Sequence, residues 1–206
     1  MKTTASLPDK LHLGCFDQPL DGWHNTDITP HLRIARIPGA ASLLYRLGKM
    51  NREMFDQHRE GIFRKVKYLN LGRPFPFQDS HFKYVFSCHV FEHIPRPILA
   101  SALQEILRVM KSGGTMRVVI PDLSWFVARY TPESADEFVK GVFEIEHGME
   151  KNRHHWMYSF VSMKSVLEAA GFVNVSEKSY RIGSCPDIDQ LDNRPDHSIF
   201  MEAEKP

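Results

Sequence analysis

One stretch of the chain, Tyr84–Asp122, constrains the fold more than any other. It reads YVFSCHVFEHIPRPILASALQEILRVMKSGGTMRVVIPD. A short β-forming run leads to a loop closed by Pro95 and Pro97, and the residues after it have the spacing of an amphipathic helix. Gly113 and Gly114 end that helix, and a second apolar run follows at Met116–Ile120. Strand, helix and strand at this length predict a right-handed βαβ unit, so the sheet is at least partly parallel.

The rest of the chain supplies more strands and helices around this unit. We expect strands at Lys10–Leu13, Trp23–Ile28, Val66–Leu71, Phe172–Tyr180 and His197–Ala203, the last two as an antiparallel pair. We expect helices within Ala40–Lys65, where they would cover a sheet face, and at Trp125–Tyr130, Ala135–Glu146 and Ser162–Gly171, with Ser162 as N-cap. Only about a dozen residues separate the first two strands, which is too short for a full crossover helix. The pattern predicts a doubly wound α/β fold with a mostly parallel sheet and an antiparallel C-terminal edge, in a single domain over residues 1–206.

Composition excludes several classes of function. The 206 residues carry a net charge of +1, so no specific nucleic-acid partner is expected. Three distant cysteines without a CxxC pair argue against a disulfide scaffold and fit a reducing cytoplasm. The N-terminal residues do not form a signal peptide, and no apolar run is long enough to span a membrane. We therefore expect a cytoplasmic protein with a small-molecule partner; its oligomeric state is not predicted.

Fragments in a characteristic order carry a resemblance to a known family. They are Leu11–Cys15, Gly22–Asp27, Leu69–Leu71, Pro74–Phe77, Ser87–His93, Arg108–Gly114, Val119–Asp122, His155–Tyr158, Ala170–Phe172 and Leu191–Pro195. Together they resemble a class I S-adenosylmethionine-dependent methyltransferase, of the small Rossmann-like group often linked to sugar or polysaccharide pathways. The resemblance implies S-adenosyl-L-methionine as cofactor and a small-molecule or sugar-type acceptor that remains unidentified.

The same resemblance implies where the cofactor binds. Gly14 and Cys15 would approach its amino-acid portion, and Asp27 would accept hydrogen bonds from the ribose hydroxyls. Asp27 could also be a turn residue before Thr29; the resemblance favours the ribose. Asn70 and Leu71 would lie at the adenine, where the Asn70 amide oxygen can accept from the amino group. The backbone up to His89 would line the sulfonium.

Phe16 departs from the family pattern, which has a glycine at the third position of the first loop. A phenylalanine does not adopt positive φ cheaply and can fill cofactor space. We therefore expect weakened cofactor binding, with tighter binding in Phe16→Gly. The competing possibility is that Phe16 points away and the loop reaches the cofactor by another backbone path. The alternative function is a methyltransferase-like binding or scaffold domain that has lost turnover. Lys83, which replaces a family aspartate, is a second departure that can be purely structural.

His89, Glu92 and His93 match HxxEH, the inverted zinc-protease motif. That motif requires a helix, whereas here a β-type run precedes it and Pro95 follows, so we expect no metal. His93 is a candidate general base for an acceptor hydroxyl, and its alternative role, with Glu92, is to stabilise the loop. Residues His154–Trp156 could close over the acceptor, although exposed loop histidines are the commoner case.

Overall fold

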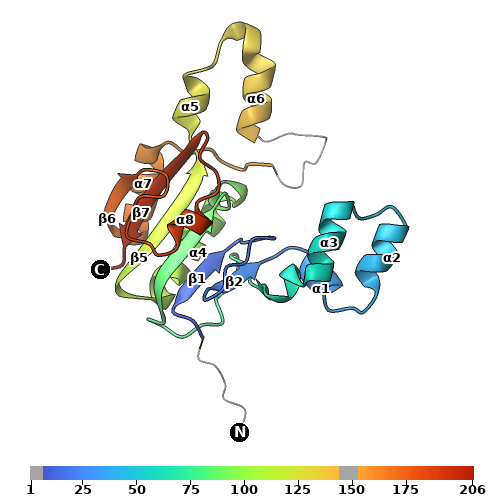
Figure 1. Cartoon of the computed structure of the whole chain (residues 1–206). Helices are drawn as coiled ribbons and strands as arrows, with labels where there is room; N and C mark the ends of the chain where they lie inside the picture. Colours follow the sequence, from blue (N-terminus) through green and yellow to red (C-terminus); the bar gives the residue numbers. More distant parts are fainter. Residues whose placement is uncertain (1–6, 144–152) are drawn as a thin grey trace.

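The computed structural model describes residues 7–143 and 153–206, which form a twisted sheet with helices on its outside (Figure 1). The seven strands run in the order β3-β2-β1-β4-β5-β7-β6. Their bounds are β1 Lys10–Leu13, β2 His24–Asp27, β3 Lys67–Tyr68, β4 Phe82–Cys88, β5 Met110–Pro121, β6 Val173–Lys178 and β7 Ser198–Glu204. The strands β1 to β5 pair in parallel, and β7 is antiparallel to both β5 and β6. The predicted α/β sheet with an antiparallel C-terminal edge is confirmed.

The predicted helices are present close to their expected ranges, and two short helices, His31–Ile34 and Ile188–Leu191, were not predicted. The helices are α1 His31–Ile34, α2 Ala40–Arg46, α3 Arg52–Glu60, α4 Arg96–Val109, α5 Leu123–Val127, α6 Ala135–Phe143, α7 Phe160–Ala170 and α8 Ile188–Leu191. The predicted last turn of α6, residues 144–146, lies outside the described residues. The N-cap of α7 is Ser159 rather than Ser162, because the two serines form a capping box in which Ser162 is the third helical residue. No described helix is long and apolar enough to cross a membrane.

Helices α2 and α3 do not cover a sheet face, contrary to our expectation. Neither contains a buried residue, and they pair with each other beyond the β3 edge of the sheet (Figure 1). The stacked rings of Tyr45 and Phe55, 4.5 Å apart, join them. Amphipathic spacing predicted the helices correctly, but such spacing does not say which surface their apolar side will meet.

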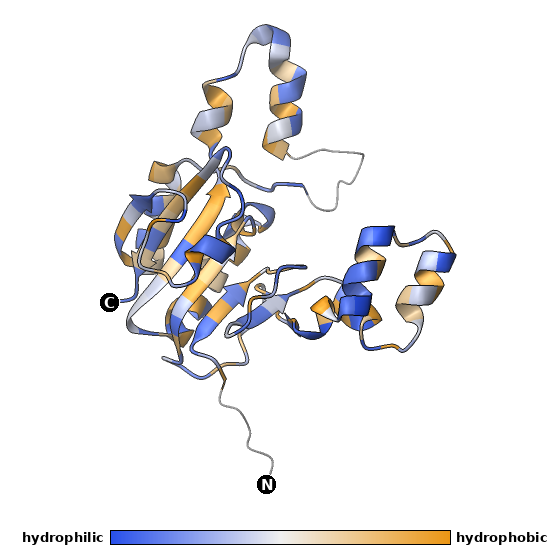
Figure 2. Cartoon of the chain, in the orientation of Figure 1, coloured by the Kyte–Doolittle hydropathy of each residue, from blue (hydrophilic) through white to orange (hydrophobic). Residues whose placement is uncertain are grey.

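The two faces of the sheet are covered in different ways. On one face α4 and α7 pack on alternate residues of the central strands, such as Val85, Val118 and Met201. These strands are the hydrophobic centre of the molecule (Figure 2). The other face carries Phe86, Val119 and Phe200, and residues 179–192, with the short α8, lie over it. The connection between β1 and β2 contains no helix, as predicted, so this C-terminal segment covers part of the face instead.

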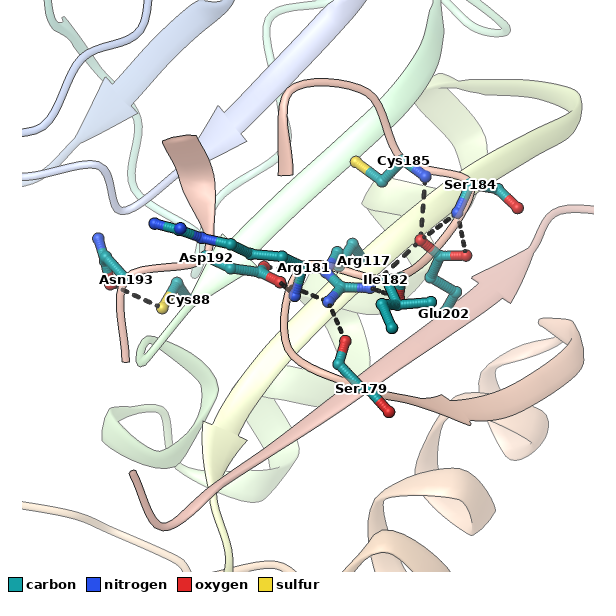
Figure 3. A network of polar contacts seen from close by, with 10 residues as sticks. All are labelled: Cys88, Arg117, Ser179, Arg181, Ile182, Ser184, Cys185, Asp192, Asn193 and Glu202. Carbon is teal, nitrogen blue, oxygen red and sulfur yellow. Dashed lines mark hydrogen bonds and ion pairs between the residues drawn. The ribbon is translucent and has the colours of Figure 1, made fainter. Parts of the chain in front are cut away.

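A buried ion network fixes the covering segment 179–192 to the sheet (Figure 3). Arg117 on β5 is fully buried; its Nε and Nη2 donate to the Asp192 carboxylate at 2.9 and 2.5 Å. Its Nη1 lies 3.4 Å from Glu202 on β7, and its guanidinium also donates to the carbonyls of Ser179 and Ile182. The network therefore ties both ends of the segment to β5 and β7.

Candidate functional site

The first element of the site is the loop that follows β1. Gly14 has φ +65, and a Cβ there would lie 2.3 Å from Cγ2 of Val90 in the loop after β4. Only glycine satisfies both the backbone conformation and this close approach. Cys15 is buried and its N–H donates to the carbonyl of Thr26, while burial and then the nearby Asp27 raise the pKa of its thiol. Cys15 is therefore a packed thiol and not a nucleophile.

Replacing Gly14 tests this close packing. We expect Gly14→Ala to lower the free energy of unfolding by about 1–2 kcal/mol for the backbone conformation alone, with a further loss from contact with Val90. Gly48 is the matched control, since it has the same φ of +65 and a Cβ added to it would have nothing within 4 Å. In urea unfolding, Gly14→Ala should lose more than Gly48→Ala, and adding Val90→Ala should remove the difference. Equal losses in the two single variants would contradict the packing argument.

Asp27 ends β2 and holds the same loop in place. Its Oδ2 accepts from the N–H of Phe16 at 2.9 Å, and its Oδ1 accepts from the N–H of Thr29 at 2.7 Å. The carboxylate has about four lone-pair directions, so two such bonds leave capacity for the pair of hydroxyls of a ribose. The turn role and the ribose role considered from the sequence are therefore compatible.

Phe16 adopts the left-handed conformation that a glycine would take at this position. Its φ is +45, its N–H is held by Asp27, and its ring packs edge-on against His31 and Phe63. The tight turn is thus formed despite the phenylalanine. The backbone strain is of the order of 1–3 kcal/mol, and these contacts offset part of it.

Asn70 and Leu71 follow β3, beside the end of β2. The N–H of Leu69 donates to the Asp27 carbonyl at 3.1 Å, which extends the pairing of the two strands up to Asn70. The Asn70 side-chain oxygen accepts from the N–H of Gly72, and Leu71 packs on the core. A pocket of about 530 Å³ lies just past β2 and β3; it is lined by Ile28, Thr29, Pro30, Leu32, Arg33, Arg36 and Tyr68.

His89 is the first residue after β4, and its backbone has φ +50. Its Nε2 lies 2.9 Å from the Ser198 hydroxyl, and its Nδ1 lies 3.5 Å from Oε1 of Glu92. Glu92 is fully buried in the 3-10 turn η2, Phe91–His93. The HxxEH residues are therefore not on an α-helix, in agreement with the sequence analysis.

A cluster that the sequence analysis did not assemble lies beside His89. His93 Nε2 is 3.9 Å from the Glu92 carboxylate, and the rings of His93 and His154 are 4.9 Å apart. His154 is 5% exposed, so the expectation of an exposed loop histidine is wrong for it, although its neighbour His155 is exposed. The N–H groups of His155 and Trp156 donate to the Glu92 carbonyl, and these bonds bring residues 154–156 onto η2. The adjacent histidines His154 and His155 were a sign of this cluster in the sequence. Nothing in the local sequence indicated which of the two side chains is buried.

Taken together, the predicted residues meet at one edge of the sheet. Four strands are neighbours in the order β3-β2-β1-β4, and one predicted residue lies at or just past the carboxyl end of each: Asn70, Asp27, Gly14 and His89. Parallel strands present their carboxyl ends at the same edge, where ligands of α/β proteins bind. The strand order and the flanking helices define a Rossmann-like α/β protein.

Comparison with known proteins names the family. The model of a methyltransferase domain family matches residues 24–177, more than half of the chain, so the chain belongs to this family. The cofactor that the family implies is S-adenosylmethionine. The residues fit that group: the loop at Gly14 has no room for a Cβ, and Asp27 keeps acceptor capacity next to a pocket.

Two solved structures with TM-scores above 0.5 share the fold at low sequence identity. The PH0226 protein from Pyrococcus horikoshii is 15% identical with a TM-score of 0.52, over 100% of this chain and 85% of that one. A SAM-dependent methyltransferase from Archaeoglobus fulgidus is 17% identical with a TM-score of 0.51, over 95% and 85%. The S-adenosylmethionine-dependent methyltransferase SibL is 14% identical with a TM-score of 0.49, and the match covers 96% of this chain but only 50% of that longer chain. No curated protein matches the sequence.

Proposed function

We propose that the chain transfers the methyl group of S-adenosylmethionine to an oxygen of a small, sugar-type acceptor. One observation carries this proposal: a glycine turn, a carboxylate and an amide follow three adjacent strands, and a polar cluster follows the fourth. The first three suit the amino-acid, ribose and adenine parts of the cofactor. The fourth, His89 with Glu92 and His93, suits a reacting hydroxyl group.

The protein's part in the reaction is to bind, align and accept a proton. The bound cofactor supplies an electrophilic methyl group on a positively charged sulfur. An acceptor hydroxyl that takes this methyl group would have to lose its proton, so the chain needs a group that accepts the proton. His93 is the candidate base. Its Nδ1 faces the Arg153 carbonyl at 3.4 Å and therefore carries the ring proton, which leaves the lone pair on Nε2 to take the proton of the acceptor. Alignment of the two reacting atoms supplies much of the rate of such a transfer.

The scaffold alternative is not favoured by the geometry of Phe16. The scaffold alternative assumed that Phe16 disturbs the tight turn after β1. That turn is formed, with Phe16 at φ +45. We therefore revise the expected effect of its replacement.

Calorimetric titration with S-adenosylmethionine tests the proposed function. We expect saturable binding to the native chain. The affinity of Phe16→Gly should differ from it by no more than about threefold, because the turn is already formed with phenylalanine in place. A tenfold difference would require a change of about 1.4 kcal/mol in the free energy of binding. Transfer of a labelled methyl group to a panel of sugars and sugar acids then identifies the acceptor. Absence of binding in the native chain, with binding restored in Phe16→Gly, would support the scaffold alternative instead.

A further inference from the structure

Three side chains near the end of β4 form a compact group of metal-binding donors. Glu92, His93 and His154 each offer one ligand atom, and these atoms all lie within 4.8 Å of one another. Two ligands of one zinc ion, each about 2.0–2.2 Å from it, are about 3–4 Å apart. A shift of the donor atoms by about 1 Å would therefore bring all three to bonding distance.

The outer hydrogen bonds of the two histidines orient their rings for ligation. His154 Nδ1 is 2.9 Å from the carbonyl of Val142, and His93 Nδ1 is 3.4 Å from that of Arg153. A carbonyl oxygen only accepts, so each Nδ1 carries the proton and each Nε2 carries the lone pair. Histidines that bind metals almost always donate their other ring N–H to such a partner.

The donor set also indicates the kind of cation. Two imidazole nitrogens and one carboxylate suit first-row divalent ions such as zinc, whereas magnesium and calcium prefer oxygen ligands only. Three protein ligands leave at least one coordination position open, as in sites where a metal binds water or substrate. Glu92 is fully buried, and a divalent ion would stabilise its negative charge there.

We propose that Glu92, His93 and His154 bind a divalent first-row metal ion, and that its open position takes an oxygen of the methyl acceptor. The HxxEH motif is not the basis, because His89 is outside the set and the residues are not on an α-helix. The role at the acceptor rests on the proposed function; the metal site itself does not. With the metal bound, Nε2 of His93 would be a ligand and could not act as the base. The metal would then lower the pKa of the acceptor hydroxyl, whose proton would pass to solvent.

Zinc binding by the chelator-treated full chain tests the site directly. We expect one equivalent of zinc by titration with zinc alone and by elemental analysis after gel filtration. Three variants each remove one ligand: Glu92→Gln, which keeps the side-chain volume, His93→Ala and His154→Ala. Each should weaken zinc binding by more than roughly 10–100-fold, which is the cost of losing only a hydrogen-bond partner of a ligand. His155→Ala is the matched control, since this exposed histidine lies in the same loop and should leave binding unchanged.

The outcomes separate the site from the proposed function. No zinc binding, or binding that survives all three ligand variants, or equal loss in His155→Ala, overturns the site. If a ligand variant does not fold, the visible absorption of cobalt in the native chain decides, because coordination by two histidines and a carboxylate gives a spectrum that free cobalt lacks. Titration with S-adenosylmethionine in the absence of metal reports on the proposed function alone. Equal methyl transfer by zinc-free and zinc-loaded protein would overturn the role at the acceptor.

Discussion

Arg117→Met is expected to destabilise the protein by about 3–5 kcal/mol, the usual cost of breaking a buried ion pair from one side. Asp192 would lose its two bonds to the guanidinium and, among the described residues, keep the N–H of Arg181 as its only donor. Both Asp192 and Glu202 would remain buried. For a chain of this size the midpoint of thermal unfolding should fall by roughly 6–20 °C. Thermal unfolding followed by circular dichroism measures the change.

Two further variants show whether uncompensated charge is the cause. Arg117→Met combined with Asp192→Asn should recover part of the lost stability, because the most isolated buried charge is then removed. Lys164→Met is the control, since its pair with Glu168 on α7 is 3.7 Å long and exposed on both sides. It should change the unfolding midpoint little, as exposed pairs contribute about 0–1 kcal/mol. A small effect of Arg117→Met, comparable to that of Lys164→Met, would show that the network is not important for stability.

Asp27→Ala is expected to weaken S-adenosylmethionine binding by about tenfold or more. A hydrogen bond to a charged group is worth roughly 1.5–3 kcal/mol, and the variant removes the acceptor proposed for both ribose hydroxyls. It also releases the N–H groups of Phe16 and Thr29, so the loop after β1 loses its support. Calorimetric titration of both proteins gives the ratio of affinities.

The control for this variant is Asp21→Ala, in the connection between β1 and β2. The Asp21 side chain is 88% exposed and pairs only with Lys65 among the contacts of the described residues, so cofactor affinity should be unchanged. Asp27→Asn keeps one acceptor oxygen for the N–H of Thr29 but places an amide NH2 opposite the N–H of Phe16, so it removes the charge together with that second bond. Equal affinities of the native chain and Asp27→Ala would remove Asp27 from the cofactor site.

The sequence predicted the sheet well because its strands and α4 have strong local patterns. Tyr84–Asp122 alone indicated the parallel unit, and the short gap before Asp27 correctly excluded a helix there. The position of α2 and α3 could not be predicted, because an amphipathic pattern does not identify the surface it packs on. The covering segment 179–192 was also missed, since its attachment depends on Arg117, which is far away in the sequence.

The candidate site was predictable only where residues follow strands. Gly14, Asp27, Asn70 and His89 could be placed at the ends of predicted strands, and the sheet order brings them to one edge. His154 is separated from Glu92 and His93 by about 60 residues in the sequence. Their proximity depends on hydrogen bonds from the N–H groups of residues 155 and 156 to the Glu92 carbonyl. No local periodicity encodes such a contact, so the sequence suggested a loop-stabilising role for Glu92 and an exposed His154.

The covering segment 179–192 also affects how the chain can fold. It closes over β1, β4 and β5, which are made much earlier during synthesis, and Asn193 hydrogen-bonds Gln18 in the loop after β1. Contacts over such long separations in sequence slow folding, because a large loop must close before they form. Until residues 179–192 leave the ribosome, Phe86 and Val119 have no cover from this segment, and the nascent chain exposes an apolar surface that chaperones can bind.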